Sequence, residues 1–186
     1  LTPLPFDDLW GKKGVFTTIR VVGNPPKFIL LDEHVMNLNI SLKKFGINFI
    51  LTHKQMNELI HTSIYDNTSY DHLLRIAINS KKISISLRPR LQPNKFFMAT
   101  IVNYQRTNPM IKNLYYKKII SLLKNNNNSN NEVILTKNDI VLEGCTTNIL
   151  CVRMKKIYMP LTNYYKGMTL KYIVNKSRKK IIKRNI

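Results

Sequence analysis

The alternation of apolar and polar residues divides the first hundred positions of the chain into strands and two helices. Residues 14–22 are mostly β-branched or aromatic, and a turn signal rich in Gly and Pro separates them from the apolar residues 27–32. This arrangement predicts a β-hairpin. Apolar residues then recur at every third or fourth position until Gly46, which predicts an amphipathic helix with Asp32 as its N-terminal cap.

A second helix and three further strands follow in the pattern. The helix is predicted over residues 54–64. Residues 73–78 and 83–89 are apolar stretches joined by a polar turn, and residues 96–102 form another apolar stretch of strand length. Helices and strands in this order indicate a small α+β domain, which we place at residues 1–103.

The remaining residues, 104–186, are predicted to form a larger, cofactor-binding second domain. A helix is expected to begin at Pro109, with Lys112 in its opening turn, and a last helix is expected to begin near Thr169 and continue into the basic end of the chain. Between these helices the pattern predicts a low-complexity loop at 125–131 and two hairpins, with strands at 132–136 and 140–143 and at 146–152 and 157–160.

Composition narrows the class of protein. The 186 residues are 44% hydrophobic, which is enough for one good core or two modest ones. No apolar run approaches the roughly 18–20 residues that span a bilayer. Cys145 and Cys151 have no His nearby and are interpreted as reduced thiols rather than a disulfide or a zinc site. We therefore expect a cytoplasmic protein, or an organellar one if a leader has been removed, with no membrane partner.

The net charge of +20 first suggests nucleic acid as a partner. The excess is mostly Lys, however, and it is spread along a chain that is also rich in Asn and Ile. This distribution is typical of coding bias, and basic residues cluster only at 176–184. Nucleic acid is therefore not the partner we expect.

Candidate chemistry comes from three places in the second half of the chain. Glu143 ends an apolar strand and is followed by small polar residues. Gly167 and Thr169 mark a helix start, where free N–H groups and the positive end of the helix dipole can hold a phosphate. Together with Lys112, these features suggest pyridoxal phosphate, because a Lys bonds this cofactor, a carboxylate pairs with its protonated ring nitrogen and a cradle holds its phosphate.

Four motifs occur in an order that resembles the fold-type-IV pyridoxal phosphate enzymes. Along the chain they are FTTIRV, PMIKNLYY, EGCTTNI and GMT, and the resemblance spans about residues 16–174. The family includes the branched-chain and D-amino-acid aminotransferases and 4-amino-4-deoxychorismate lyase. The resemblance implies a two-domain α+β fold similar to that of D-amino-acid aminotransferase. FTTIRV looks more like the lyase, since the aminotransferases tend to have Glu-Gly where Thr17 and Thr18 stand.

The resemblance also implies roles for individual residues. Lys112 would be the catalytic residue that bonds the cofactor and moves the substrate proton. Glu143 would keep the pyridine nitrogen protonated, and Asn148 would begin the next core strand. The other cofactor-binding residues implied are Arg20, Tyr116, Thr146, Thr147, Met168 and Thr169. No metal is implied.

The function implied is that of a lyase that converts 4-amino-4-deoxychorismate to 4-aminobenzoate and pyruvate in folate biosynthesis. The resemblance further implies a homodimer acting on a small-molecule substrate. An aminotransferase acting on branched-chain or D-amino acids is the alternative, and transfer of an amino group to a keto acid would separate the two. A second alternative is a degenerate, non-catalytic relative that uses its basic surface for binding polyanions.

Several positions depart from the family pattern. In the family, H-x-x-R-L supplies an Arg that grips the cofactor phosphate, whereas here His34 and Leu38 match and Asn37 replaces the Arg. A neutral amide loses a charge-assisted contact of about 1.5–3 kcal/mol. Tyr115 stands where the family often has Asn. Family members also continue well beyond the motif at 167–169, so the second domain is expected to be truncated at its C-terminus.

Overall fold

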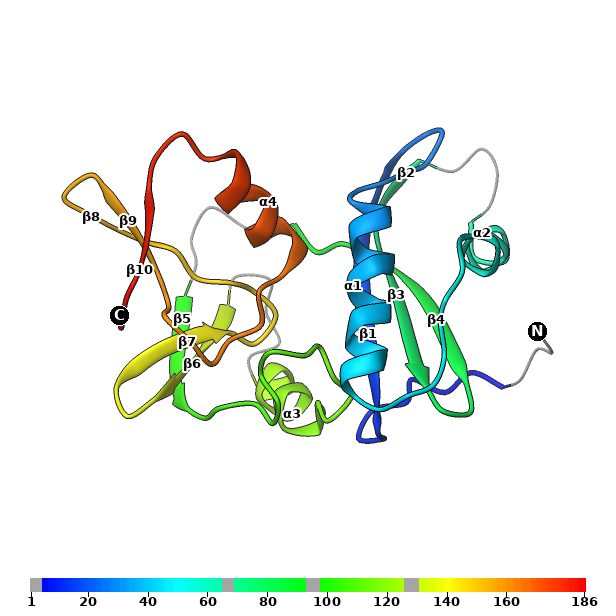
Figure 1. Cartoon of the computed structure of the whole chain (residues 1–186), viewed down its shortest axis with the longest axis horizontal. Helices are drawn as coiled ribbons and strands as arrows, with labels where there is room; N and C mark the ends of the chain where they lie inside the picture. Colours follow the sequence, from blue (N-terminus) through cyan, green and yellow to red (C-terminus); the bar gives the residue numbers. More distant parts are fainter. Residues whose placement is uncertain (1–4, 65–68, 93–97, 126–130) are drawn as a thin grey trace. The chain divides into compact units, whose positions relative to one another are not determined.

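The computed structural model describes the chain in four stretches, residues 5–64, 69–92, 98–125 and 131–186 (Figure 1). The chain divides into two compact units: the first unit is Leu1–Leu91 with Lys112–Tyr115, and the second unit is Gln92–Ile111 with Tyr116–Ile186. These bounds differ from the expected division at residue 103. Strand β5 (Met98–Asn103) pairs with a strand of the second unit, and the segment that starts at Lys112 returns to the first.

A four-stranded antiparallel sheet forms the centre of the first unit. Its order is β2-β1-β3-β4, with β1 at Gly14–Gly23, β2 at Lys27–Phe28, β3 at Tyr70–Asn79 and β4 at Ile83–Pro89. These strands confirm the hairpin predicted near the N-terminus and the two strands predicted after it. Strand β2 is shorter than expected, because Leu30 adopts a left-handed conformation and the following helix begins at Leu31.

Two helices accompany this sheet. Helix α1 (Leu31–Lys44) lies along the sheet (Figure 1), and it buries Val35, Leu38 and Leu42, the apolar stripe that the pattern predicted. The prediction that Asp32 caps this helix is wrong, because the helix begins at Leu31 with Leu30 as its N-cap, and Asp32 lies inside its first turn. Helix α2 (His53–His61) starts at a reciprocal capping box, which satisfies its first N–H groups.

The segment from Lys112 to Leu114 adds to the outer edge of β1. The Phe16 N–H donates to the Lys112 carbonyl at 2.9 Å, and the Leu114 N–H donates to the Gly14 carbonyl at 2.9 Å. The predicted helix at Pro109 is therefore wrong for this segment, since these backbone groups pair with a strand. Helix α3 starts later and spans Lys117–Asn125.

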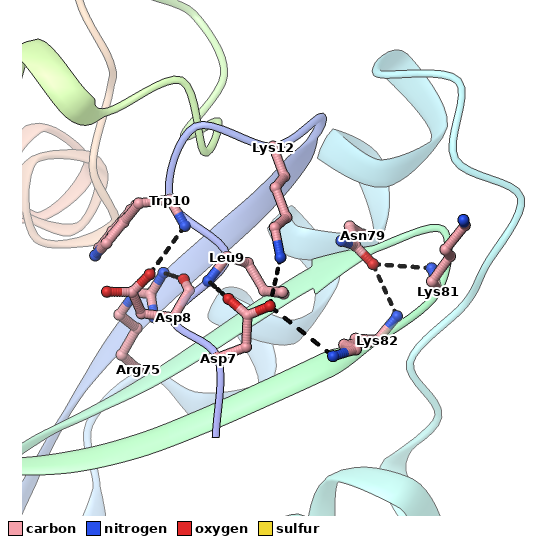
Figure 2. A network of polar contacts seen from close by, with 9 residues as sticks. All are labelled: Asp7, Asp8, Leu9, Trp10, Lys12, Arg75, Asn79, Lys81 and Lys82. Carbon is pink, nitrogen blue, oxygen red and sulfur yellow. Dashed lines mark hydrogen bonds and ion pairs between the residues drawn. The ribbon is translucent and has the colours of Figure 1, made fainter. Parts of the chain in front are cut away.

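The residues before β1 are tied to the first unit's sheet by a polar network (Figure 2). The carboxylate of Asp7 pairs with the ammonium group of Lys12, and this bond lowers the pKa of Asp7. The ammonium group of Lys82 lies 3.9 Å from the same carboxylate. The guanidinium carbon of Arg75, on β3, lies 3.7 Å from the centroid of the Trp10 ring. Trp10 is thereby held over the sheet just before β1 begins.

Two three-stranded sheets form the second unit. In the first, β5 pairs parallel with β6 and β6 pairs antiparallel with β7, while in the other β8 and β9 are antiparallel and β9 and β10 parallel. The strands are β6 at Asn131–Lys137, β7 at Ile140–Gly144, β8 at Cys151–Arg153, β9 at Lys156–Met159 and β10 at Ile181–Lys183. Both hairpins predicted for this half are confirmed, although β8 starts at Cys151, five residues later than the strand predicted at 146–152.

The end of the second unit differs from the prediction. Helix α4 spans Met168–Lys176, so the helix predicted near Thr169 is confirmed at its start. The basic residues beyond Lys176 are not helical, because the chain turns into β10 and pairs with β9. The predicted loop at 125–131 lies for the most part outside the described residues.

A small apolar cluster joins α4 to the sheet of β8, β9 and β10. Met159, Tyr164 and Leu170 are buried together, and three partly buried side chains pack against them: Leu150, Val174 and Ile181. This cluster fixes the N-terminal end of α4 within the second unit. Within the described stretches, no helix combines the length and the apolar character that a membrane crossing requires.

Gly14 gives a direct test of the edge that Lys112–Leu114 forms with β1. A Cβ at this position would lie 2.5 Å from the Ile78 carbonyl oxygen and 2.5 Å from Leu114 Cδ1. We expect Gly14→Ala to lower the free energy of unfolding by about 1–3 kcal/mol. The exposed neighbour Lys13, changed to Ala, should alter it by no more than about 0.5 kcal/mol. Urea unfolding followed by circular dichroism measures both, and equal stabilities would contradict this packing.

Candidate active site

The predicted site residues are divided between the two units. Lys112 and Arg20 belong to the first unit. The others belong to the second unit, where they gather at the end of β7 and the start of α4: Tyr116, Glu143, Thr146, Thr147, Met168 and Thr169. Each group has its own set of contacts.

Lys112 is fixed by its backbone and lies against an aromatic ring. Its carbonyl accepts from Phe16, and its Nζ lies 5.0 Å from the centroid of the Phe16 ring. Phe16 is buried, and the Trp10 ring meets it edge-on at 4.9 Å between centroids. An ammonium group over a ring face gains cation–π stabilisation, so the Lys112 side chain is directed rather than left to solvent.

Arg20 forms an ion pair on β1. Its Nη2 lies 2.6 Å from Asp71 Oδ1, and about a third of its side chain is exposed (34%). Its Nε is buried and has no hydrogen-bond partner among the described residues. Nearby on β1, Thr17 Oγ1 lies 2.7 Å from His34 Nδ1, which connects the strand to α1.

Glu143 is a buried carboxylate held by a forked ion pair. The residue is 4% exposed, and its partner Arg106 is 5% exposed. Arg106 Nε donates to Oε1 at 2.8 Å and Nη2 donates to Oε2 at 2.9 Å, while the Tyr165 N–H donates to Oε2 at 3.0 Å. Forked, charge-assisted bonds of this kind are the strong class of hydrogen bond and fix the plane of the carboxylate.

A second buried carboxylate shapes the loop that follows Glu143. Glu132 is 6% exposed, and its Oε2 accepts the hydroxyl groups of Thr146 at 3.2 Å and Thr147 at 2.8 Å. The loop folds closely over it, since a Cβ on Gly144 would lie 2.1 Å from Thr147 Oγ1. The two hydroxyl hydrogens therefore point to Glu132.

Asn148 joins this loop to the start of α4. Its Nδ2 donates to the Tyr165 carbonyl at 2.5 Å, and its Oδ1 accepts from the Gly167 N–H at 3.1 Å. The expectation that Asn148 begins a strand is wrong, because its side chain bridges two segments and β8 starts only at Cys151. Asn148 thus sets the position of the loop relative to the helix start.

The loop and the helix start together present unpaired N–H groups. Within the described residues, the N–H groups of Thr146 and Thr147 have no hydrogen-bond partner, and neither have those of Met168, Thr169 and Leu170 in the first turn of α4. Gly167 caps the helix without a side-chain bond, and Lys171 is the first residue to donate within it. Unpaired N–H groups at a helix start favour an anion such as phosphate.

Tyr116 and Cys145 are buried next to the ion pair of Arg106 and Glu143. The Tyr116 hydroxyl donates to the Cys145 carbonyl at 2.5 Å, and the Arg106 guanidinium carbon lies 6.0 Å from the centroid of its ring. Burial raises the pKa of Tyr116. Burial, together with the charges of Glu132 and Glu143, raises the pKa of the Cys145 thiol to about 12. Both groups are therefore neutral at physiological pH.

The motifs did not reveal Arg106 and Glu132. Glu132 starts a predicted strand, and an acid beside an apolar run is unusual in a chain with 10 acidic and 30 basic residues, so that signal was present. Arg106 had no such signal, because it precedes Lys112 in a polar stretch and its partner lies 37 positions further along the chain.

Comparisons with known proteins agree with this fold. The family model described as amino-transferase class IV matches residues 14–186. A proposed 4-amino-4-deoxychorismate lyase of Legionella pneumophila is similar with a TM-score of 0.77 and 17% identity, over 100% of this chain and 78% of that chain. The branched-chain amino acid aminotransferase of Thermobaculum terrenum, solved in its PLP-form, has a TM-score of 0.74 and 18% identity, over 100% and 72% of the two chains. No curated protein matches the chain.

These findings confirm the predicted resemblance to fold-type-IV pyridoxal phosphate enzymes and the predicted α+β fold of that class. A third similar structure, a hypothetical aminotransferase from Mycobacterium tuberculosis, has a TM-score of 0.78 at 15% identity and is covered over 77% of its chain. Identities this low establish the fold and leave the substrate open.

The two free cysteines test the burial of the loop after Glu143. At about pH 8 the Cys145 thiol, with its pKa near 12, is almost entirely protonated, and the thiolate is the reactive form. We expect iodoacetamide to label the half-buried Cys151 and to leave Cys145 unlabelled in the native protein. Peptide mass spectrometry measures this. Both cysteines should react in urea, and equal labelling of the folded protein would contradict the burial.

Proposed function

Since this chain belongs to amino-transferase class IV, we propose that it binds pyridoxal 5'-phosphate and acts as a lyase on 4-amino-4-deoxychorismate, releasing 4-aminobenzoate and pyruvate. The observation that supports this most directly is the set of unpaired N–H groups beside a buried, ion-paired carboxylate. Asn148 and the Tyr165 N–H tie the two features together within the second unit.

The donor set fits this cofactor. A phosphate is an acceptor-only dianion, and the loop at Thr146 with the first turn of α4 offers backbone N–H donors. A protonated pyridine nitrogen requires an ionised carboxylate, and Glu143 is stabilised in that form by Arg106. When bound, pyridoxal phosphate supplies the electron sink for breaking bonds at the carbon that carries the amino group.

The chain's own residues would then divide the work. Lys112 would hold the cofactor and, once released by the substrate amine, take the proton from the ring carbon that bears nitrogen. Loss of that proton and departure of the enolpyruvyl group, which becomes pyruvate on protonation, leave an aromatic ring. Thr147 and Thr169 would bind the phosphate through their N–H groups, while Tyr116 would support the loop from behind.

The lyase is favoured over an aminotransferase by one sequence feature. Thr17 and Thr18 stand where the resembling aminotransferases tend to have Glu-Gly, and Thr17 is engaged with His34 at 2.7 Å. A class IV aminotransferase acting on branched-chain substrates is the second candidate, since a protein of that name shares the fold. Production of 4-aminobenzoate without a keto acid supports the lyase, and transfer of an amino group to a keto acid supports the alternative.

Covalent attachment to Lys112 is the central test. We expect added pyridoxal phosphate to give a visible absorbance band, and borohydride reduction followed by peptide mapping to place the label on Lys112. Lys112→Ala should lose the band, whereas the exposed neighbour Lys117, changed to Ala, should retain it. Label scattered over surface lysines, with no band, would contradict the assignment and favour a non-catalytic relative.

Asn37 gives a gain-of-function test. Restoring the positive charge with Asn37→Arg should strengthen cofactor binding, because a charge-assisted bond contributes about 1.5–3 kcal/mol. This corresponds to a dissociation constant lowered by about ten- to a hundredfold. Asn37→Gln keeps the amide without adding charge and should leave the constant unchanged. A spectroscopic titration with pyridoxal phosphate measures all three proteins, and equal constants would show that a positive charge at position 37 does not contribute to holding the cofactor.

A further inference from the structure

The ion pair at the end of β7 is both forked and buried. Both oxygens of Glu143 accept from one guanidinium group, and the side chains of Arg106 and Glu143 are 4% and 5% exposed. The Tyr165 N–H adds a further bond to the same carboxylate. Its plane is thus set by three donors, and the group cannot rotate without breaking at least one bond.

Arg106 is fixed at its other side as well. Its Nη2 donates to the Pro109 carbonyl at 3.1 Å, and its guanidinium lies over the ring of Tyr116. The Pro109 carbonyl lies in the backbone that leads directly to Lys112. One guanidinium therefore fixes both the carboxylate and part of the segment that precedes the lysine.

The positive charge of Arg106 compensates the negative charge of the buried Glu143 carboxylate. A buried carboxylate is unfavourable unless it is paired, and removing one partner of a buried pair leaves the other uncompensated. Without Arg106, Glu143 would have to be neutralised before a cofactor arrived. With Arg106 it is already charged and oriented, so a protonated ring nitrogen can bind without that cost.

We propose that Arg106 is a positioning residue that acts through Glu143, holding the carboxylate ionised and aimed for the protonated ring nitrogen of the cofactor. This inference rests on the proposed function. Arg106 itself contacts neither substrate nor cofactor in this role, and its influence on cofactor binding passes entirely through the carboxylate.

A double-mutant cycle on cofactor affinity tests this. We expect Arg106→Gln and Glu143→Gln each to raise the dissociation constant for pyridoxal phosphate by about tenfold or more, and the double variant to bind no more weakly than Glu143→Gln alone. Arg178→Gln, at an exposed arginine of the same unit, is the control and should match the wild type. Circular dichroism verifies that each variant is folded.

Every outcome decides the matter. If Arg106→Gln melts at a lower temperature but binds the cofactor as the wild type does, Arg106 is merely structural and the proposal is wrong. If the two losses of affinity add in the double variant, Arg106 acts independently of Glu143, and the proposal is again wrong. If Arg106→Gln does not fold, Arg106→Lys replaces it. That variant keeps the charge and loses the fork, so we expect a dissociation constant about threefold or more above wild type, and wild-type affinity would overturn the proposal.

Failure of the proposed function looks different. In that case the wild-type protein gives no saturable binding of pyridoxal phosphate, and the inference falls with it. Thermal unfolding of the same cofactor-free variants would still show non-additive losses, since the ion pair exists in the protein alone. Wild-type binding with an unaffected Arg106 variant, in contrast, overturns the inference and leaves the proposed function in place.

Discussion

The buried pair of Arg106 and Glu143 is the interaction on which the second unit's candidate site depends. Two opposite charges removed from water are tolerated only when their geometry is good and their remaining donors and acceptors are satisfied. Here the fork satisfies the carboxylate, and the Pro109 carbonyl and the Tyr165 N–H complete the set. The segment before Lys112 is bonded to this pair directly, and the loop and the helix start are connected to it through Asn148 and Tyr165.

The polar side chains around this ion pair satisfy different groups of the loop and of the start of α4. Glu132 takes up the hydroxyl hydrogens of the loop, and Asn148 takes up the backbone groups beside α4. Each of these bonds gives a side chain a fixed partner within the protein and holds the backbone around it in place. The remaining N–H groups at Thr146 and Met168 are held by bonds made elsewhere, and backbone groups fixed in this way are suited to binding an anion.

The sequence predicted the fold class and most hairpins because their signals are local. Alternating apolar residues and turn residues are read within ten positions, as at β6 and β7, where Asn138 and Asp139 form the turn with positive φ. The extended backbone at Lys112, in contrast, could not be predicted from local signals. Its local pattern resembles a helix, whereas the unpaired edge of β1, far away in sequence, draws the segment into an extended pairing. Arg106 was missed for the same reason.

The return of residues 112–114 to β1 also constrains how the chain can fold during synthesis. The edge of β1 is completed only by residues that leave the ribosome about 100 positions after β1 itself, and contacts of such separation slow folding. By then β3, β4 and β5 have all emerged. Part of the β1 edge in the first unit therefore stays unpaired during synthesis, while strand β5 of the second unit has already left the ribosome. An unfinished sheet edge is a template for wrong pairing, so the segment that presents Lys112 also protects this part of the β1 edge once it has paired.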